Sequence, residues 1–328
     1  MTDGRTNVKN RRVAVLAAAV LGVLAISPAT AANAEDSESL DALLARVAPE
    51  VRENLYDGAS AARGAQPVTP ATVPTTGAEP VTTHGEDGSV SIWLPTATAV
   101  AEDSVAGEGV RLFEHGNGAT SVPLVKDDGS VQILTLIDDA AAPESYSYSV
   151  DVAEGATLAV DADGAVHITS ATGEFIGGVA PAWAVDANGA PVPTSYQVDG
   201  TTLTQLIDHD GGQYAYPIVA DPWLGQDLYY QPTVTFPSGG YKINVTPRAW
   251  GQTWAGPATW FAHVDEVKSK LGGNAWRWTN TIQEQFYCHI AGLPASLPQY
   301  NLESWRPLVG WAQSLAQYRC NPYDGAWS

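Results

Sequence analysis

The chain has 328 residues and a net charge of −20, with 36 acidic and 16 basic side chains. The charge is unevenly distributed. Residues 241–328 carry a net +2 and the first 34 residues carry +3, which leaves −25 for residues 35–240. A strongly acidic surface repels phosphate groups, so the composition argues against nucleic acid as a partner. The two differently charged halves predict two modules.

Residues 1–34 have the pattern of a secretory signal peptide. A basic stretch ends at Arg12, the run Val13–Ile26 is almost wholly apolar, and Ala32-Asn33-Ala34 supplies small residues at a cleavage site. The apolar run, at about 14 residues, is shorter than the roughly 20 that a membrane-spanning helix needs. We therefore expect cleavage after Ala34, secretion, and no stable membrane anchor afterwards. The general secretory and the twin-arginine export routes both remain open.

Two short segments are expected to follow the leader. In residues 35–63, apolar side chains recur at helical spacing: Leu40, Leu43, Leu44, Val47, Val51 and Leu55. This spacing predicts a short amphipathic helix, which Pro49 kinks or ends. Residues 64–86 contain four prolines among Thr, Ala and Gly, a composition that buries too little apolar surface to order the chain. We expect a flexible linker there.

Residues 87–223 are expected to form an acidic, β-rich domain. Tyr146, Tyr148 and Val150 alternate with polar residues, which is the period of a strand with one buried face. Tight turns are marked by Asp128-Gly129, Asp163-Gly164, Asn188-Gly189 and Asp199-Gly200. Short alternating runs between regular turns predict an antiparallel β-sandwich or barrel.

Residues 224–328 are expected to form a small α+β domain. The runs Thr233–Phe236 and Tyr241–Val245 flank a Pro-Ser-Gly-Gly turn, which predicts a β-hairpin. Three helices are expected after it: Pro257–Leu271, Ala275–Ile290 with Asn274 as its cap, and Pro307–Tyr318. Their apolar stripes give core positions to Trp260, Trp278 and Trp311.

Both cysteines of the chain, Cys288 and Cys320, lie in this last domain. An even pair in an exported protein is most simply a disulfide. Closing a loop of about 33 residues should stabilise the domain by roughly 3 to 4 kcal/mol. The alternative is a Cys288 nucleophile assisted by His289. Neighbours on a helix point about 100° apart, which is poor geometry for such a pair, so we predict one disulfide.

Four spaced motifs in this domain carry a resemblance to a known family. They are Val245-Thr246-Pro247-Arg248-Ala249-Trp250, Cys288-His289, Asn301-Leu302-Glu303-Ser304-Trp305-Arg306-Pro307 and Cys320-Asn321-Pro322. Over about the last 90 residues the chain resembles the bacterial domain of unknown function 2599. The body, with Pro181–Asp186 and Tyr216–Pro222, is similar to the bodies of secreted actinobacterial proteins. The resemblance implies an exported actinobacterial protein and brings no established activity.

Three polar residues are the catalytic candidates. His289, Glu303 and Arg306 could converge on one cleft, where a histidine and a carboxylate share acid and base work and an arginine grips an anion. Alternatively, His289 ends a helix while Glu303 and Arg306 form an ion pair. His263 and Glu266, one helical turn apart, lack a complete set of metal ligands, so we predict neither a metal nor a cofactor.

Tryptophan supplies the binding candidates. Residues 241–328 hold eight of the eleven tryptophans, and the predicted helical stripes do not need all of them. The candidates are Trp250, Trp254, Trp276 and Trp327. Exposed indoles present flat apolar faces that suit sugar rings or a protein partner. Alternatively, a small domain fills its core with large aromatic side chains.

These features predict a secreted, non-enzymatic envelope or extracellular protein. Its C-terminal domain would recognise a cell-envelope polymer or another secreted protein. The alternative is a small secreted hydrolase or antibacterial effector that uses His289 with Glu303 and Arg306. The sequence leaves open whether the protein is an enzyme. It favours a non-enzymatic protein, because no complete set of catalytic residues is present.

Overall fold

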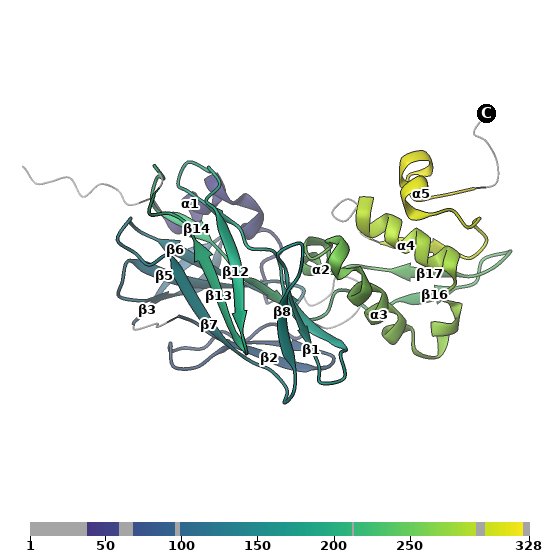
Figure 1. Cartoon of the computed structure of the whole chain (residues 1–328), viewed down its shortest axis with the longest axis horizontal. Coiled ribbons are helices and arrows are strands. Elements are labelled where there is room, and N and C mark those ends of the chain that lie inside the picture. The colour runs from purple at the N-terminus through teal and green to yellow at the C-terminus, as the bar shows by residue number, and fades with distance from the viewer. Residues whose placement is uncertain (1–37, 59–67, 96–98, 212, 293–298, 324–328) are drawn as a thin grey trace, which may run out of the picture. The chain divides into compact units, whose positions relative to one another are not determined.

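The computed structural model describes residues 38–58, 68–95, 99–211, 213–292 and 299–323 (Figure 1). All of them belong to one compact unit, Glu38–Ser328. The predicted signal peptide (1–34), the start of the predicted linker (64–67) and Trp327 lie outside the described residues.

Two antiparallel sheets form the body of the described chain. The smaller has five strands, in the order β1 (Val81–Gly85), β2 (Gly88–Trp93), β7 (Ser145–Asp151), β13 (Thr202–Ile207) and β12 (Thr194–Asp199). The larger has ten: β3 (Ala99–Val105), β4 (Glu108–Glu114), β5 (Ala119–Val125), β6 (Val131–Ile137), β15 (Trp223–Gly225), β10 (Phe175–Val179), β9 (Val166–Thr169) and β8 (Thr157–Val160) in that order, with β14 (Ile218–Ala220) and β11 (Ala184–Val185) attached beside β6.

A shared hydrophobic core lies between the two sheets. Tyr146, Tyr148 and Val150, at alternate positions of β7, are buried in one cluster with Ile133 and Ile168 of the larger sheet. The predicted alternation is therefore confirmed, and the fold is the sandwich alternative. Among the described strands, neither sheet closes into a barrel.

Strand β6 is buried on both of its faces. Ile133 and Ile137 point into the core between the sheets, while Leu134 and Leu136 contribute to a second cluster on the other side. Helix α1 (Leu40–Val47) covers that side with buried leucines, and the 3-10 helix η1 (Pro49–Arg52) adds the buried Val51. Because proline lacks the N–H that continues a helix, α1 ends before Pro49, as predicted.

Two expected boundaries differ in the structure. Strand β1 falls within the predicted linker (64–86), and Thr72 bridges to Thr82 of that strand. The density of prolines before β1 hid a run, Val81-Thr82-Thr83, of β-branched residues that favour strands. The expected boundary between residues 223 and 224 cuts β15, where Leu224 pairs with both Val179 and Val131.

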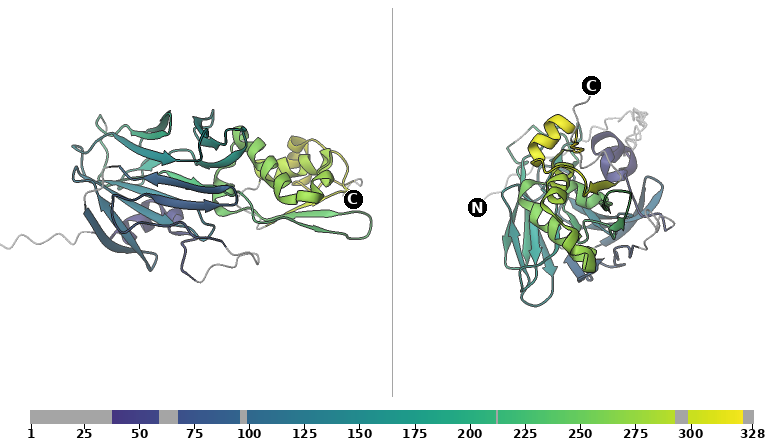
Figure 2. Two further views of the ribbon diagram at one scale, coloured as in Figure 1. Left: turned by 90° about the horizontal axis from the view of Figure 1, so that it is seen from below. Right: turned by 90° about the vertical axis from the view of Figure 1, so that its right-hand side faces the viewer.

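The C-terminal domain is α+β, as predicted. The predicted hairpin consists of β16 (Thr233–Thr235) and β17 (Lys242–Val245), and β18 (Tyr300–Glu303) adds a third, unpredicted strand beside β17. The hairpin extends to the right, in green, in the left view of Figure 2. The helices are α2 (Ala249–Thr253), η2 (Pro257–Thr259), α3 (Trp260–Leu271), η3 (Gly272–Arg277), α4 (Asn280–Gly292) and α5 (Trp311–Tyr318).

Two predicted helices begin later than expected. Residues 272–277 form the 3-10 helix η3, so α4 starts at Asn280 instead of Ala275. Helix α5 starts at Trp311 instead of Pro307. At this start, the Glu284 carboxylate accepts a hydrogen bond from Trp311 N at 2.6 Å. A carboxylate at this point satisfies a free N–H and interacts favourably with the helix dipole.

Candidate functional site

His289 is buried inside the C-terminal domain. It lies on α4 with 3% of its surface exposed, and its ring stacks on Tyr300 with centroids 4.9 Å apart. Burial lowers the pKa of His289 to about 4, so the ring is neutral at pH 7. Within the described residues, neither ring nitrogen has a hydrogen-bond partner. The predicted role of His289 as a general acid or base is therefore not supported by its position.

Glu303 and Arg306 form the ion pair that was the structural alternative. Arg306 Nε donates to Glu303 Oε2 at 2.5 Å, and its Nη1 donates to the carbonyl of Pro322 at 3.1 Å. These contacts fasten the segment after α5 to the end of β18. Among the described residues, no hydrogen bond or ion pair joins His289 to either of them. The expected cleft of three catalytic residues is not assembled, because α4 turns His289 toward the core.

His263 and Glu266, which we had considered as metal ligands, have other partners. His263 Nδ1 lies 2.7 Å from the Tyr229 hydroxyl, and its Nε2 lies 2.6 Å from the Trp254 carbonyl. The Glu266 carboxylate accepts hydrogen bonds from the backbone N–H groups of Leu228 and Tyr229. In the part of the chain that the structure describes, no group of three His, Cys, Asp or Glu side chains could hold a metal ion.

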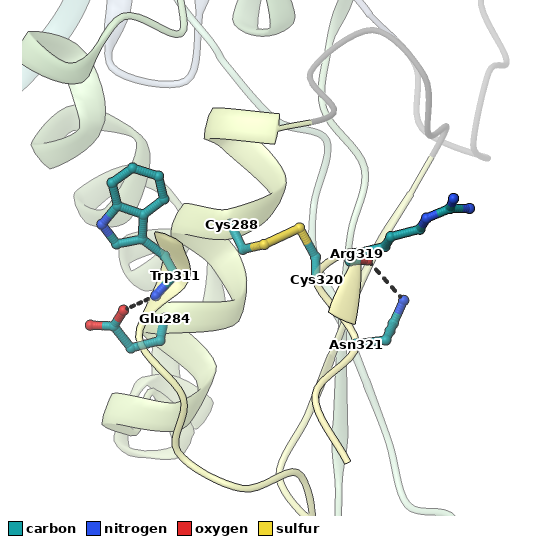
Figure 3. The surroundings of a disulfide bond; sticks show 6 residues. All are labelled: Glu284, Cys288, Trp311, Arg319, Cys320 and Asn321. Carbon is teal, nitrogen blue, oxygen red and sulfur yellow. Dashed lines mark hydrogen bonds between the residues drawn. A yellow bond between two sulfur atoms is a disulfide. The ribbon is translucent and has the colours of Figure 1, made fainter. Parts of the chain in front are cut away.

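The predicted disulfide is present (Figure 3). It joins Cys288 on α4 to Cys320, just past the end of α5, with the two Cα atoms 5.4 Å apart. Together with the hydrogen bond from Trp311 N to Glu284, it holds α5 against α4 at both ends. A cysteine in a disulfide has no thiolate, so the alternative of Cys288 as a nucleophile is set aside.

Trp250 and Trp254, two of the binding candidates, are fully buried. Their indoles stack on each other with centroids 5.3 Å apart, and Trp254 also stacks on Phe175 at 4.8 Å. Trp250 Nε1 donates to the carbonyl of Trp223 at 3.1 Å. Neither ring faces a ligand, so this part of the prediction is wrong: the two tryptophans dock the C-terminal domain onto the larger sheet.

Two glycines make room for these indoles. Gly178 of β10 and Gly225 of β15 are direct partners across the sheet. A Cβ atom at Gly225 would overlap the Trp250 ring, and one at Gly178 would lie 2.5 Å from the Val166 carbonyl oxygen and 3.1 Å from Trp254 Cζ2. We call this pair the glycine slot. Because a side chain at 225 would occupy the space of an indole, and one at 178 would clash with the neighbouring strand and crowd the second indole, the slot requires residues without a Cβ.

A different set of rings is exposed beside the hairpin. Trp276, the third binding candidate, is 70% exposed, and Phe236 is 65% exposed. The Arg277 guanidinium lies 4.1 Å from the Trp276 centroid, 4.8 Å from Phe236 and 5.0 Å from Tyr241. We call these four residues the aromatic platform. Cation–π contacts of this length hold the rings in place, so the platform is preformed.

Trp305 extends the exposed aromatic surface. It is 41% exposed, and a Cβ atom at Gly240, in the hairpin turn, would lie 3.3 Å from its ring. The fourth binding candidate, Trp327, lies outside the described residues. The remaining tryptophans expected in the core, Trp260, Trp278 and Trp311, are half-buried, and Trp260 packs edge to face on Trp311.

A cavity of about 510 Å³ lies where the body meets α3. The described residues that line it include six carboxylates and one ammonium group: Glu86, Asp87, Glu174, Asp227, Asp265, Glu266 and Lys270. Lys270 Nζ is 2.8 Å from Glu86 and 3.6 Å from Glu266. Sequence reasoning missed this cluster because its members come from distant segments, and each alone is an ordinary turn or helix-surface residue.

The contacts in this cavity show that the charged cluster connects the C-terminal domain to the body. Burial raises the pKa of Glu266 to about 7, although Lys270 and the N–H groups of Leu228 and Tyr229 favour the charged form. Arg248 Nη2 pairs with Asp227 at 2.9 Å. Lys270 thus binds the Glu86 carboxylate of the body, and Arg248 binds Asp227 in the segment that leads out of the body. Lys270 and Arg248 fasten the domain in the same region as the glycine slot.

Comparison with known proteins finds one family, and it covers most of this domain. Residues 234–323 match a family model described as a protein of unknown function, DUF2599. Neither a curated protein nor a solved structure matches the chain. Among the described residues, no helix has the length and apolar character to cross a membrane. The presence of a disulfide is compatible with an extracellular protein.

Proposed function

We propose that this is a secreted, non-enzymatic protein of the cell envelope or extracellular space, and that its C-terminal domain binds a polymer. The observation that carries the proposal is the aromatic platform, on which Phe236 and Trp276 leave most of their surface in water. Among the described rings of the domain these two are the most exposed: Phe261 at 47% and Trp305 at 41% follow, and the others are buried or half-buried.

The physical properties of the platform favour a ligand made of rings. An indole exposes a flat apolar face that stacks on the C–H face of a sugar, and each such contact buries a large area with few rotatable bonds. Contacts with Arg277 at 4.1 and 4.8 Å hold Trp276 and Phe236 before any ligand arrives. Rings that are already ordered lose little conformational entropy on binding. A polymer presents the same ring many times, which suits a shallow surface.

The alternative of a small hydrolase or antibacterial effector has less support. It requires His289 to exchange protons with a substrate, yet His289 is buried and stacked on Tyr300. Glu303 and Arg306 bind each other and so are not available as a free base and a free anion grip. A protein partner would use the same platform and is distinguished from a polymer by the binding test.

Secretion rests on the sequence pattern of residues 1–34, together with the Cys288–Cys320 disulfide, which suits an oxidising compartment. The match to DUF2599 delimits the domain without assigning it a role.

The test uses the chain from residue 35 to its end, mixed with the insoluble cell-wall fraction of the producing organism and then sedimented. We expect retention of the wild-type protein and a loss of about tenfold or more for Trp276→Ala and Phe236→Ala. Leu308→Ala, which removes an exposed apolar side chain outside the platform, serves as the matched control and should sediment like wild type. Unchanged retention of both platform variants would contradict the proposal.

A further inference from the structure

Arg277 differs from Arg248 and Arg306 of the same domain in what lies next to its positive charge. Arg248 pairs with Asp227 and Arg306 pairs with Glu303. Arg277 sits among three rings, and its Nε donates to the Asn274 side chain at 3.2 Å. Within the described residues it forms no ion pair. Its positive charge is therefore not neutralised by a carboxylate.

The described carboxylates of residues 241–328 have other positions or partners. Glu266 faces Lys270, Glu284 binds the first N–H of α5, Glu303 binds Arg306, and Asp265 lines the cavity near Lys270. Residues 241–328 carry a net +2, in contrast to −25 for residues 35–240. An anionic polymer is therefore repelled by the body, and Arg277 offers it a cation that no described carboxylate neutralises.

The guanidinium is also held in a fixed orientation. The Tyr241 hydroxyl donates to the Arg277 carbonyl at 2.8 Å, which ties η3 to the hairpin, and the rings flank the side chain. A guanidinium fork with free Nη atoms binds a carboxylate through two parallel hydrogen bonds. Within the described residues the side-chain hydrogen bond of Arg277 comes from Nε, which leaves both Nη atoms to such a partner.

We propose that the platform binds an acidic polysaccharide, in which the sugar ring stacks on Trp276 or Phe236 and its carboxylate pairs with Arg277. This inference rests on the proposed function and specifies its ligand. We choose a polysaccharide over a lipid surface because the planar fork of Arg277 beside exposed ring faces matches a sugar ring that carries a carboxylate.

The test compares two forms of one polymer: polygalacturonate, which carries a carboxylate on every sugar, and its methyl-esterified form, which keeps the backbone without the charge. Binding to the chain from residue 35 onward is measured by affinity electrophoresis or calorimetry. We expect polygalacturonate to bind at least about tenfold more tightly than the ester. Arg277→Gln should lose about tenfold, and Arg277→Lys should recover part of this loss, because lysine keeps the charge without the planar fork.

Arg319→Gln is the matched control, since Arg319 is an exposed cation beside the disulfide (Figure 3) and does not belong to the platform. It should bind like wild type, and circular dichroism of each variant verifies the fold. Equal binding of both polymers, lost in Trp276→Ala, would overturn the role of charge and leave the proposed function standing. If neither polymer binds while the platform variants lose retention on the cell-wall fraction, the inference about an acidic polysaccharide is likewise overturned and the proposed function stands. Binding to anionic phospholipid vesicles in place of polygalacturonate would overturn the inference in favour of a membrane.

Discussion

The C-terminal domain uses tryptophan in two opposite ways. At the junction with the body, Trp250 and Trp254 are fully buried, and the glycine slot is shaped to receive them. Beside the hairpin, Trp276 is mostly in water and stacks on an arginine. The difference shows that an enrichment in tryptophan does not by itself indicate either a buried core or an exposed binding surface. The same residue type fastens this domain to the body at one end and is exposed to water at the other.

The two regions also differ in how their charges are used. Near the junction, Lys270 and Arg248 are bound to carboxylates at 2.8 and 2.9 Å. On the platform, the charge of Arg277 faces rings instead. Substitutions at the junction should therefore reduce stability, whereas those on the platform should reduce binding.

The largest loss of stability is expected for Trp250→Ala. This variant removes a fully buried indole and leaves a cavity over the glycine slot, which typically costs about 3 to 5 kcal/mol of unfolding free energy. Chemical denaturation followed by circular dichroism measures the change. A loss below about 1 kcal/mol would mean that the indole does not fasten the domain.

Gly225→Ala tests the same contact from the other side. An added Cβ overlaps the Trp250 ring and should cost about 1 to 3 kcal/mol through displacement of the indole. Gly109→Ala on β4 is the matched control because nothing lies within 4 Å of the added atom. Equal stability of the two variants would contradict the slot.

Reduction of the disulfide should have an effect close to that of Trp250→Ala and larger than that of Gly225→Ala. Opening the Cys288–Cys320 bond releases a loop and should lower the unfolding free energy by about 3 to 4 kcal/mol in the chain-entropy model. The measurement is denaturation with and without reductant, and a Cys288→Ala/Cys320→Ala variant should not respond to reductant. Because the bond joins α4 to Cys320, just past α5, and does not touch the junction, the loss of stability caused by Trp250→Ala should be the same with and without reductant. A loss that depends on reductant would show that the disulfide and the junction are coupled.

The pH dependence of stability should report on Glu266 at the junction. Its pKa is about 7 in the folded protein and near 4.5 when unfolded. Between these values the native carboxyl keeps a proton that the unfolded chain has released, so its contribution to stability falls as the pH rises. Glu266→Gln removes this titration. Relative to wild type, the variant should gain up to about 3 kcal/mol between pH 4.5 and 8.

The comparison of the two proteins isolates this carboxyl. His263 and His289, whose pKa values burial lowers to about 4, are present in both and cancel in the difference. Gln keeps a carbonyl acceptor for the N–H groups of Leu228 and Tyr229. A difference in unfolding free energy that does not change with pH would show that Glu266 titrates normally.

The smallest loss of stability is expected for Trp276→Ala. A side chain that is 70% exposed contributes little to the core, so the unfolding free energy should change by no more than about 0.5 kcal/mol. The same denaturation experiment measures it. A loss comparable to that of Trp250→Ala would remove the contrast between the two regions and make the platform part of the core.

Elements set by local patterns were accessible from the sequence. The alternation Tyr146, Tyr148, Val150 gave a strand, the Asp-Gly turns separated hairpins, and the cysteine pair gave the disulfide. These features depend on neighbours in the chain, so one sequence carries the signal. The later starts of α4 and α5 depend on η3 and on Glu284, a residue from another helix, and so could not be read locally.

Features made by distant segments were not accessible. Gly178 and Gly225 become a slot because β10 and β15 pair, and Glu86 meets Lys270 because the β1–β2 turn approaches α3. The same limit explains the wrong assignment of Trp250 and Trp254 as ligand-facing. His289, Glu303 and Arg306 are near one another in the expected topology, but the direction of each side chain is set by packing against Tyr300 and Pro322.

The glycine slot also determines where this protein can be divided. The sequence that matches DUF2599 begins at residue 234, yet the socket for two of its tryptophans lies at residues 178 and 225. A fragment that begins at residue 234 would expose the indoles of Trp250 and Trp254, because the strands that bury them would be missing. Exposed apolar surface of this kind favours aggregation. For cloning, crystallisation or transfer to another scaffold, the smallest usable piece therefore includes the acidic sandwich.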